Sequence, residues 1–175
     1  MTRLHFVGAA SAALMAASLA ACNPATPAKP AVDTGKISDA VKADATQLVA
    51  DYNAHDATKV VSHMAPDGVA MFHGSPNAVG PAANAAGAKQ TFADVPDLHV
   101  TLADQAVDVA ASGDMAVFRS TYVTTLTDPK TKKPVTDKGN YLAGYKLQSD
   151  GSWKQEWSVV SDVGPPPKAA PAAKS

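Results

Sequence analysis

The sequence predicts an α+β fold, with helices first and an antiparallel sheet after them. In the first part of the folded region, apolar residues recur at helical spacing. After Pro96 they alternate with polar residues, as in half-buried strands, and turn sequences such as ASGD and SDGS separate the strand segments. Helices and antiparallel strands are thus segregated along the chain, which is typical of α+β proteins.

Two amphipathic helices are expected at the start of the folded region. The first spans about five turns, with Lys and Asp between its apolar positions. Asp56 can cap a second, shorter helix, and Pro66-Asp67-Gly68 would end the helical pattern. A loop over 74–81 is expected before a third helix near 82–94, and this helix is weaker because Gly87 interrupts it. The apolar positions of the first two helices are Ile37, Val41, Ala45, Leu48 and Tyr52, then Val60, Val61 and Met64.

Five strands are expected. A short strand over 69–73 follows the turn, and four longer strands form an antiparallel meander after Pro96. In the first strand of the meander, apolar residues occupy even positions up to Leu102 and odd positions from Val107. This change of phase predicts a β-bulge near 103–105, because side chains alternate strictly in a regular strand. The meander segments are 98–109, 115–126, 138–148 and 153–162.

The chain divides into four predicted segments. Residues 1–21 carry a positive charge at Arg3, followed by an uncharged stretch rich in Ala, Leu and Val, as in a signal peptide. Residues 22–35 are rich in Pro and Ala and are expected to form an extended tether, and residues 165–175 a disordered tail. Residues 36–164 remain as one folded domain, long enough for a single core.

The segment LAAC, residues 19–22, resembles a bacterial lipobox, in which the cysteine is lipidated and becomes the first residue of the mature chain. Cys22 is the one cysteine of the sequence, which argues against a disulfide. Acylation there, with palmitate among the chains, would anchor the protein to a membrane. Asn23 follows in place of an aspartate, so the periplasmic face of the outer membrane is the expected location. The alternative is an ordinary secretory peptide with a chance cysteine.

Composition argues against several classes of function. Residues 36–164 hold eleven Lys and Arg against fifteen Asp and Glu, a net charge of −4, so a nucleic-acid partner is not expected. His55, His63 and His99 have no zinc-type spacing, and no metal site is expected. The sequence has neither a P-loop nor the G-x-S-x-G motif of serine hydrolases. No cofactor is expected.

Two stretches resemble a known family. YNAHDATKVVSHMAPDGVAMFHG, starting at Tyr52, and GYKLQSDGSWKQEWSVVSD, ending at Asp162, resemble the nuclear transport factor two-like superfamily. Within it, the chain is similar to the SnoaL-like and ketosteroid-isomerase-like branch. The resemblance covers nearly all of 36–164 and implies a curved antiparallel sheet wrapped around the N-terminal helices, a cone whose open end holds a pocket. Neither stretch is a catalytic motif, so both indicate the fold better than the function.

The resemblance also indicates which positions of this sequence match the catalytic residues of ketosteroid isomerases. Ketosteroid isomerases use a carboxylate base, a phenol and a protonated carboxylic acid. The base position falls on His73, the phenol position on Leu48 and the acid position near Ala143. Both oxyanion donors are therefore missing, and the loss of one such donor costs about 100- to 1000-fold in rate. Steroid isomerisation is not expected.

Six residues are candidates for a site. His73 could serve as a general base, since the ordinary pKa of histidine is close to neutral; the alternative is an idle histidine at the pocket rim. Arg119 could clamp an acidic ligand inside the cone, or pair with Asp104 or Asp108. The other candidates for ligand binding are Tyr52, which lies one turn beyond the phenol position, Tyr141 and Tyr145, which flank the acid position, and Trp157.

Aromatic residues alternate onto strand faces. Trp153 and Trp157 are expected on one face of the last strand, and Phe118 and Tyr122 on one face of the middle strand. Such residues usually form a core or a dimer interface, and a homodimer through Phe118, Tyr122 and Trp157 is predicted.

Three functions follow from these observations. The first is a lipid-anchored periplasmic domain that binds a small apolar or acidic ligand, or a partner protein, without catalysis. The second is a SnoaL-like isomerase, cyclase or lyase with His73 as its base. The third is a structural dimer in the cell envelope.

Overall fold

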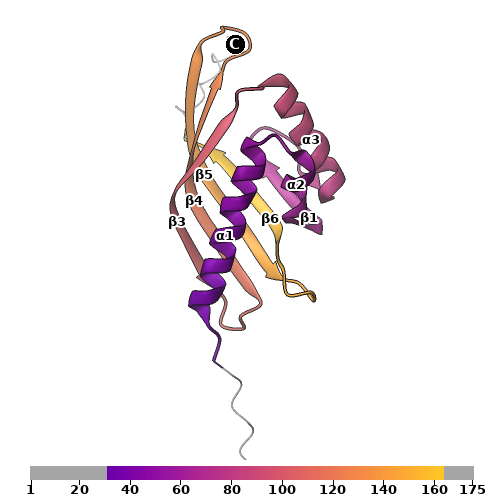
Figure 1. Cartoon of the computed structure of the whole chain (residues 1–175), viewed down its shortest axis with the longest axis vertical. Helices are drawn as coiled ribbons and strands as arrows, with labels where there is room; N and C mark the ends of the chain where they lie inside the picture. The colour runs from indigo at the N-terminus through magenta and orange to yellow at the C-terminus, as the bar shows by residue number, and fades with distance from the viewer. Residues whose placement is uncertain (1–30, 164–175) are drawn as a thin grey trace, which may run out of the picture. The chain divides into compact units, whose positions relative to one another are not determined.

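The computed structural model describes residues 31–163, which form three helices and a six-stranded sheet (Figure 1). The α+β class and the order of the predicted elements are confirmed. None of the helices described between residues 31 and 163 combines the length and apolar composition needed to cross a bilayer. The elements are α1 (Thr34–Asn53), α2 (Ala57–Ser62), β1 (Met64–Phe72), β2 (Ala78–Val79), α3 (Gly80–Asp94), β3 (His99–Val109), β4 (Met115–Thr127), β5 (Pro134–Leu147) and β6 (Trp153–Asp162).

The strand order in the sheet is β2-β1-β6-β5-β4-β3. Strands β3 to β6 form the predicted antiparallel meander, and β1 adds to its far side in parallel with β6. The three helices cover one face of the sheet, with α1 beside β3 and α2 and α3 toward β1 (Figure 1). The sheet is curved and unclosed, so its helix-covered face is concave.

Two irregularities interrupt the meander. In β3 the pairing with β4 shifts between Ala103 and Ala106, which confirms the predicted bulge. Asp104 there adopts a left-handed conformation, with φ of 54°. A second shift, between Gly144 and Tyr145 of β5, was not predicted. Bulges bend a strand and increase its twist, so both help the sheet to curve around the helices.

Three local predictions were wrong. Helix α1 begins at Thr34, inside the predicted tether, because Asp33 caps it by accepting a hydrogen bond from the Lys36 amide at 3.0 Å. The sequence Pro66-Asp67-Gly68 lies within β1, where it causes a register shift against β6 instead of a turn. Residues 74–81, predicted as a loop, contain the short strand β2, which pairs with Val69 and Ala70.

The core lies between α1 and the middle of the sheet. Val41 and Ala45 of α1 are fully buried, and they pack with residues of β4 and β5. This is the apolar stripe that predicted the first helix, so burial of one helix face explains why it forms. The sheet residues of this core are Ala116, Phe118, Ala143 and Tyr145.

The aromatic residues do not share one face. Trp153 packs against the core, but the shift at Tyr145 moves Trp157 to the outer, convex face, where its ring lies over Gly144. Phe118 is fully buried and Tyr122 is 9% exposed, both on the concave face. The predicted dimer surface is therefore wrong in two of its three residues. Dimerisation itself stays a prediction.

Candidate functional site

A cavity of about 640 Å³ lies between the concave face of the sheet and the three helices. Its walls are mostly apolar: Leu48 and Val49 come from α1, Val60 and Val61 from α2, and further apolar groups from β1, α3 and β3. Such a volume is within the range of pockets that hold small organic molecules. The polar side chains in the lining are Tyr52, Ser75, Asn84, Thr91, Tyr122, Thr124, Tyr141, Gln155 and Ser158.

The lining carries no charged side chain. Among the residues that the structure places around the cavity there is no Asp, Glu, His, Lys or Arg. Burial raises the pKa of the Tyr52 hydroxyl, and burial together with Asp162 raises that of Tyr122, so both phenols stay neutral near pH 7. The Tyr122 hydroxyl donates to Asp162 Oδ1 at 2.9 Å, which fixes the ring against the wall. The cavity is thus suited to an uncharged ligand.

Three side chains form a hydrogen-bonded chain that leads away from the cavity. The Tyr141 hydroxyl donates to Gln155 Oε1 at 3.0 Å, and Gln155 Nε2 donates to the Tyr145 hydroxyl at 2.8 Å. Tyr141 and Gln155 line the cavity, whereas Tyr145 is fully buried behind them. Burial is the main cause that raises the pKa of both phenols, so both are neutral hydrogen-bonding groups.

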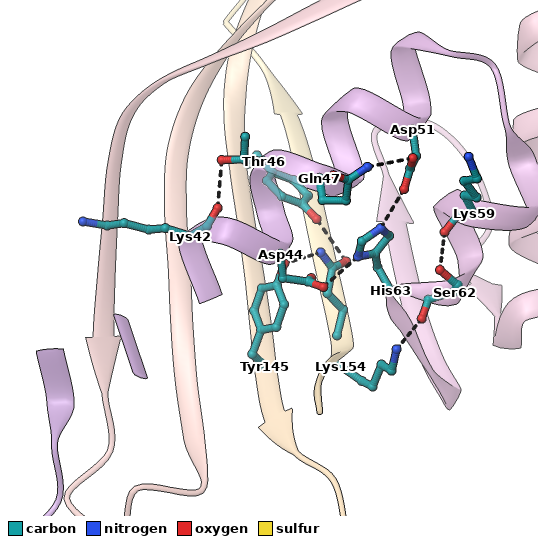
Figure 2. Close-up of polar contacts among 12 residues, drawn as sticks. Lys42, Asp44, Thr46, Gln47, Asp51, Lys59, Ser62, His63, Tyr145 and Lys154 are labelled. Atoms are coloured by element: carbon teal, nitrogen blue, oxygen red, sulfur yellow. Dashed lines mark hydrogen bonds and ion pairs between the residues drawn. The ribbon is translucent and has the colours of Figure 1, made fainter. Parts of the chain in front are cut away.

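A buried histidine between two carboxylates lies beyond this chain (Figure 2). His63 ends α2; its Nδ1 is 2.7 Å from Asp44 Oδ1 and its Nε2 is 3.1 Å from Asp51 Oδ2. Both carboxylates project from α1, and Gln47 donates to the other oxygen of Asp51 at 2.9 Å. A carboxylate can only accept hydrogen bonds, so both ring nitrogens donate and His63 is an imidazolium ion. We call Asp44, His63 and Asp51 the buried triad.

Charge and burial act in opposite directions on the pKa of His63. The hydrogen bond with Asp44 raises it most, burial lowers it, and Asp51 raises it further, so the pKa lies above its ordinary value. In turn, the hydrogen bond from His63 lowers the pKa of Asp51, although burial opposes this shift. Both shifts favour the charged forms of His63 and Asp51.

The structure separates the predicted site residues into two groups. Tyr52 and Tyr141 line the cavity, and Tyr145 supports Tyr141 through Gln155. Of the positions matched to the ketosteroid isomerase donors, Leu48 lines the cavity, but Ala143 is buried in the core. Neither side chain can donate a hydrogen bond to a ligand.

The other predicted residues lie elsewhere. His73 follows the end of β1, is exposed, and is not part of the cavity lining. Arg119 lies on the convex face, where its Nε is 3.5 Å from Asp108 and its side chain is 59% exposed. That geometry matches the alternative of a surface pair and not a buried clamp. Trp157 covers Gly144 on the same convex face.

Sequence reasoning missed the buried triad. No other histidine stands at a metal-ligand spacing from His63, so the sequence pattern predicts no site there. The signal that could have found it lies in α1, where Asp44 and Asp51 are two turns apart and so share a helix face. Two acidic groups on one helix face, followed by a histidine at the end of the next helix, indicate an ionic contact between the helices.

Two further predictions concern metals and the lipid anchor. Within residues 31–163 no group of three or more His, Cys, Asp or Glu side chains is arranged to hold a metal ion. Cys22 and the tail 165–175 lie outside the described residues. Lipidation of Cys22 therefore stays a prediction.

Similar proteins agree with this architecture. A ketosteroid isomerase-like protein from Erwinia carotovora atroseptica is 26% identical, covering 73% of this chain and 96% of its own, with a TM-score of 0.63. An NTF2-like protein with a cystatin-like fold from Novosphingobium aromaticivorans is 18% identical over 77% of this chain and 84% of its own, with a TM-score of 0.61. A protein with a cystatin-like fold from Caulobacter vibrioides is 15% identical, covering 73% and 89%, with a TM-score of 0.64. No curated protein matches the sequence.

The match to a family is more specific than these likenesses in fold. The model of the SnoaL-like domain matches residues 45–155, which run from the middle of α1 into β6 and include most of the cavity lining. This confirms the predicted branch of the nuclear transport factor two-like superfamily. The chain belongs to the SnoaL-like domain family.

Proposed function

We propose that this domain binds a small, uncharged and mostly apolar molecule in its cavity. The observation that carries the proposal is a cavity of about 640 Å³ with a mainly aliphatic and aromatic wall and no charged group in its lining. An apolar molecule gains about 25 cal/mol for each Å² of surface that it removes from water, and such a wall supplies that gain. A charged molecule would lose its hydration without an ionic partner.

The same lining favours binding over catalysis. General acid–base catalysis needs a group that exchanges a proton near neutral pH within hydrogen-bond reach of the substrate. The described lining offers neutral phenols, hydroxyls and amides. His73, the predicted base, is not in that lining. An isomerase, cyclase or lyase that uses His73 therefore gains no support from the geometry, and binding without catalysis is the function that we favour.

A filled cavity provides the test. Ala88 lies in the lining on α3, so Ala88→Phe should place a ring in the cavity, whereas Ala86 is exposed on the same helix and outside the lining. An uncharged apolar fluorophore, N-phenyl-1-naphthylamine, should bind the full chain with a rise in fluorescence. We expect Ala88→Phe to weaken this binding at least tenfold and Ala86→Phe to leave it unchanged. Equal binding by both variants would place the probe outside the cavity and overturn the proposal.

The site would act at a membrane surface if Cys22 is acylated. The lipobox-like LAAC sequence and the single cysteine support this part of the proposal. The domain would then stand in the periplasm, on a tether that lets it reach an apolar ligand near the bilayer. We expect Cys22→Ser to move the protein from the membrane pellet to the soluble fraction. An unchanged distribution between the two fractions would disprove the lipid anchor and leave the binding proposal intact.

A further inference from the structure

The buried triad lies beside the hydrogen-bonded chain that reaches the cavity (Figure 2). Asp44 Oδ1 accepts from His63 Nδ1 at 2.7 Å. The other oxygen of Asp44, Oδ2, is buried and has no donor in good geometry among residues 31–163. An ionised carboxylate accepts at both oxygens and donates at neither. Any hydroxyl that faces Asp44 must therefore point its proton toward it.

Tyr145 is the hydroxyl that faces Asp44 (Figure 2). After burial and Tyr141, interaction with Asp44 is among the causes that raise the pKa of Tyr145, as expected for a phenol next to a negative charge. A phenol has a single proton. The Tyr145 oxygen accepts from Gln155 Nε2 at 2.8 Å, so its own proton does not go to Gln155, and the nearby carboxylate of Asp44 favours the protonated phenol.

This constraint fixes the orientation of the Gln155 amide. The nitrogen must face Tyr145, where the distance is 2.8 Å, and the carbonyl oxygen must then face Tyr141, where it is 3.0 Å. The carbonyl oxygen only accepts, so the Tyr141 hydroxyl donates its single proton to Gln155. Ser158, which also lines the cavity, lowers the pKa of Tyr141, as a hydroxyl that donates to the phenol would. The Tyr141 proton and one amide proton of Gln155 are therefore used within this chain, and the Tyr141 oxygen is left as an acceptor.

We propose that the cavity selects ligands that carry a hydroxyl group, which donates a hydrogen bond to the oxygens of Tyr141 and Ser158. This inference rests on the proposed function and names the chemical class of its ligand. A ketone of the same shape would place its carbonyl oxygen against lone pairs and leave acceptors on both sides without a donor. The family's isomerases, in contrast, use donors at this end of the cone to bind a carbonyl oxygen.

Three molecules with one carbon skeleton distinguish a preference for a hydroxyl group from a preference for a carbonyl group and from apolar binding alone. They are 1-tetralol, 1-tetralone and tetralin. Titration calorimetry with the full chain should show that the alcohol binds about tenfold more tightly than the ketone, which is the effect of one hydrogen bond gained against one acceptor left unpaired. Tetralin measures the affinity that the apolar wall supplies alone. Its affinity should lie between those of the alcohol and the ketone, or equal that of the ketone.

Two variants locate the origin of the preference. Tyr141→Phe removes the accepting oxygen, and Tyr145→Phe removes the acceptor that holds the Gln155 nitrogen, so both should bring the affinities for alcohol and ketone to within about threefold of each other. Ser120→Ala is the control. Ser120 pairs with Tyr141 across the strands, and its hydroxyl is buried but makes no hydrogen bond within the described residues and does not line the cavity. The control should keep the preference of the wild type.

The outcomes distinguish the two proposals. A preference for the alcohol that both tyrosine variants abolish supports the inference. Equal binding of alcohol and ketone by the wild-type chain, or tighter binding of the ketone, overturns it and leaves the cavity as a binding site. A preference that survives in both variants overturns it as well. Absence of binding by all three molecules overturns the proposed function and the inference with it.

Discussion

At the scale of single residues, Gly139 shows how close packing positions the cavity wall. It lies on β5 between Tyr122 of β4 and Asp162 of β6, its partners across the sheet. A side chain at this position would collide with the Tyr122 ring and with the backbone oxygen of Ser161. Because Gly139 has no side chain, the Tyr122 ring can cross β5, and its hydroxyl donates a hydrogen bond to Asp162 Oδ1 at 2.9 Å.

We expect Gly139→Ala to lower the free energy of unfolding by about 1–3 kcal/mol, because the clash involves backbone that cannot rotate away. Gly87 of α3 is the matched control: a methyl group there meets no atom within 4 Å. Gly87→Ala should raise the free energy of unfolding by about 0.5–1 kcal/mol, since alanine favours a helix. Chemical denaturation measures both changes. A neutral Gly139→Ala would show that Tyr122 is free to leave its place on the wall.

At the scale of elements, the buried triad ties α2 to α1. Both helices contribute side chains to the cavity wall, so the contacts of His63 with Asp44 and Asp51 fix the position of one helix relative to the other. Removal of one member of a buried ionic group leaves an uncompensated charge and costs about 3 kcal/mol. The side chains are 10%, 20% and 9% exposed, for His63, Asp44 and Asp51, so solvent screens them little.

The triad predicts a pH dependence of stability with two limbs. The pKa of His63 is raised above 6.5 in the folded state, so its contribution is complete below pH 6.5 and is lost as the pH rises through the folded value. The pKa of Asp51 is lowered below 3.8, so its contribution is complete above pH 3.8 and is lost as the pH falls through the folded value. The triad therefore stabilises the fold most between about pH 4 and 6.5.

Comparison of His63→Gln with the wild type isolates this contribution. The difference in free energy of unfolding should be largest near pH 6 and shrink as the pH rises toward 9 and the wild-type imidazolium loses its proton. His99→Ala, at an exposed histidine of β3, should follow the wild type within about 0.5 kcal/mol at every pH. A difference that stays constant from pH 6 to pH 9 would contradict the charged triad.

Much of the element order could be predicted because local patterns determine it. The apolar stripe of α1 and the phase change in β3 are written in consecutive residues, and both features were placed correctly. The second bulge, between β5 and β6, has no comparable change of phase in the sequence. The spacing of Trp153 and Trp157 therefore predicted the wrong face for Trp157. The Pro-Asp-Gly sequence predicted a turn, but pairing of β1 with β6 kept it within a strand.

At the scale of the whole molecule, the site was harder to predict than the fold. Tyr52 and Tyr141 were found through their positions relative to a family mechanism, and both line the cavity. The buried triad joins residues from two helices through side-chain contacts that no local pattern encodes. Arg119 illustrates the opposite error: an odd charge in an apolar strand indicated a buried role, but the sheet turns that residue outward.

Native mass spectrometry of the gently purified full chain tests most directly whether the cavity holds a small uncharged molecule, because it detects a bound ligand on the intact protein. We expect a reproducible non-covalent addition of a few hundred daltons, lost on denaturation, on the wild-type protein, absent from Ala88→Phe and present on Ala86→Phe. A wild-type mass without any non-covalent addition, under conditions that preserve the fold, or the same non-covalent addition on all three proteins, would contradict the claim.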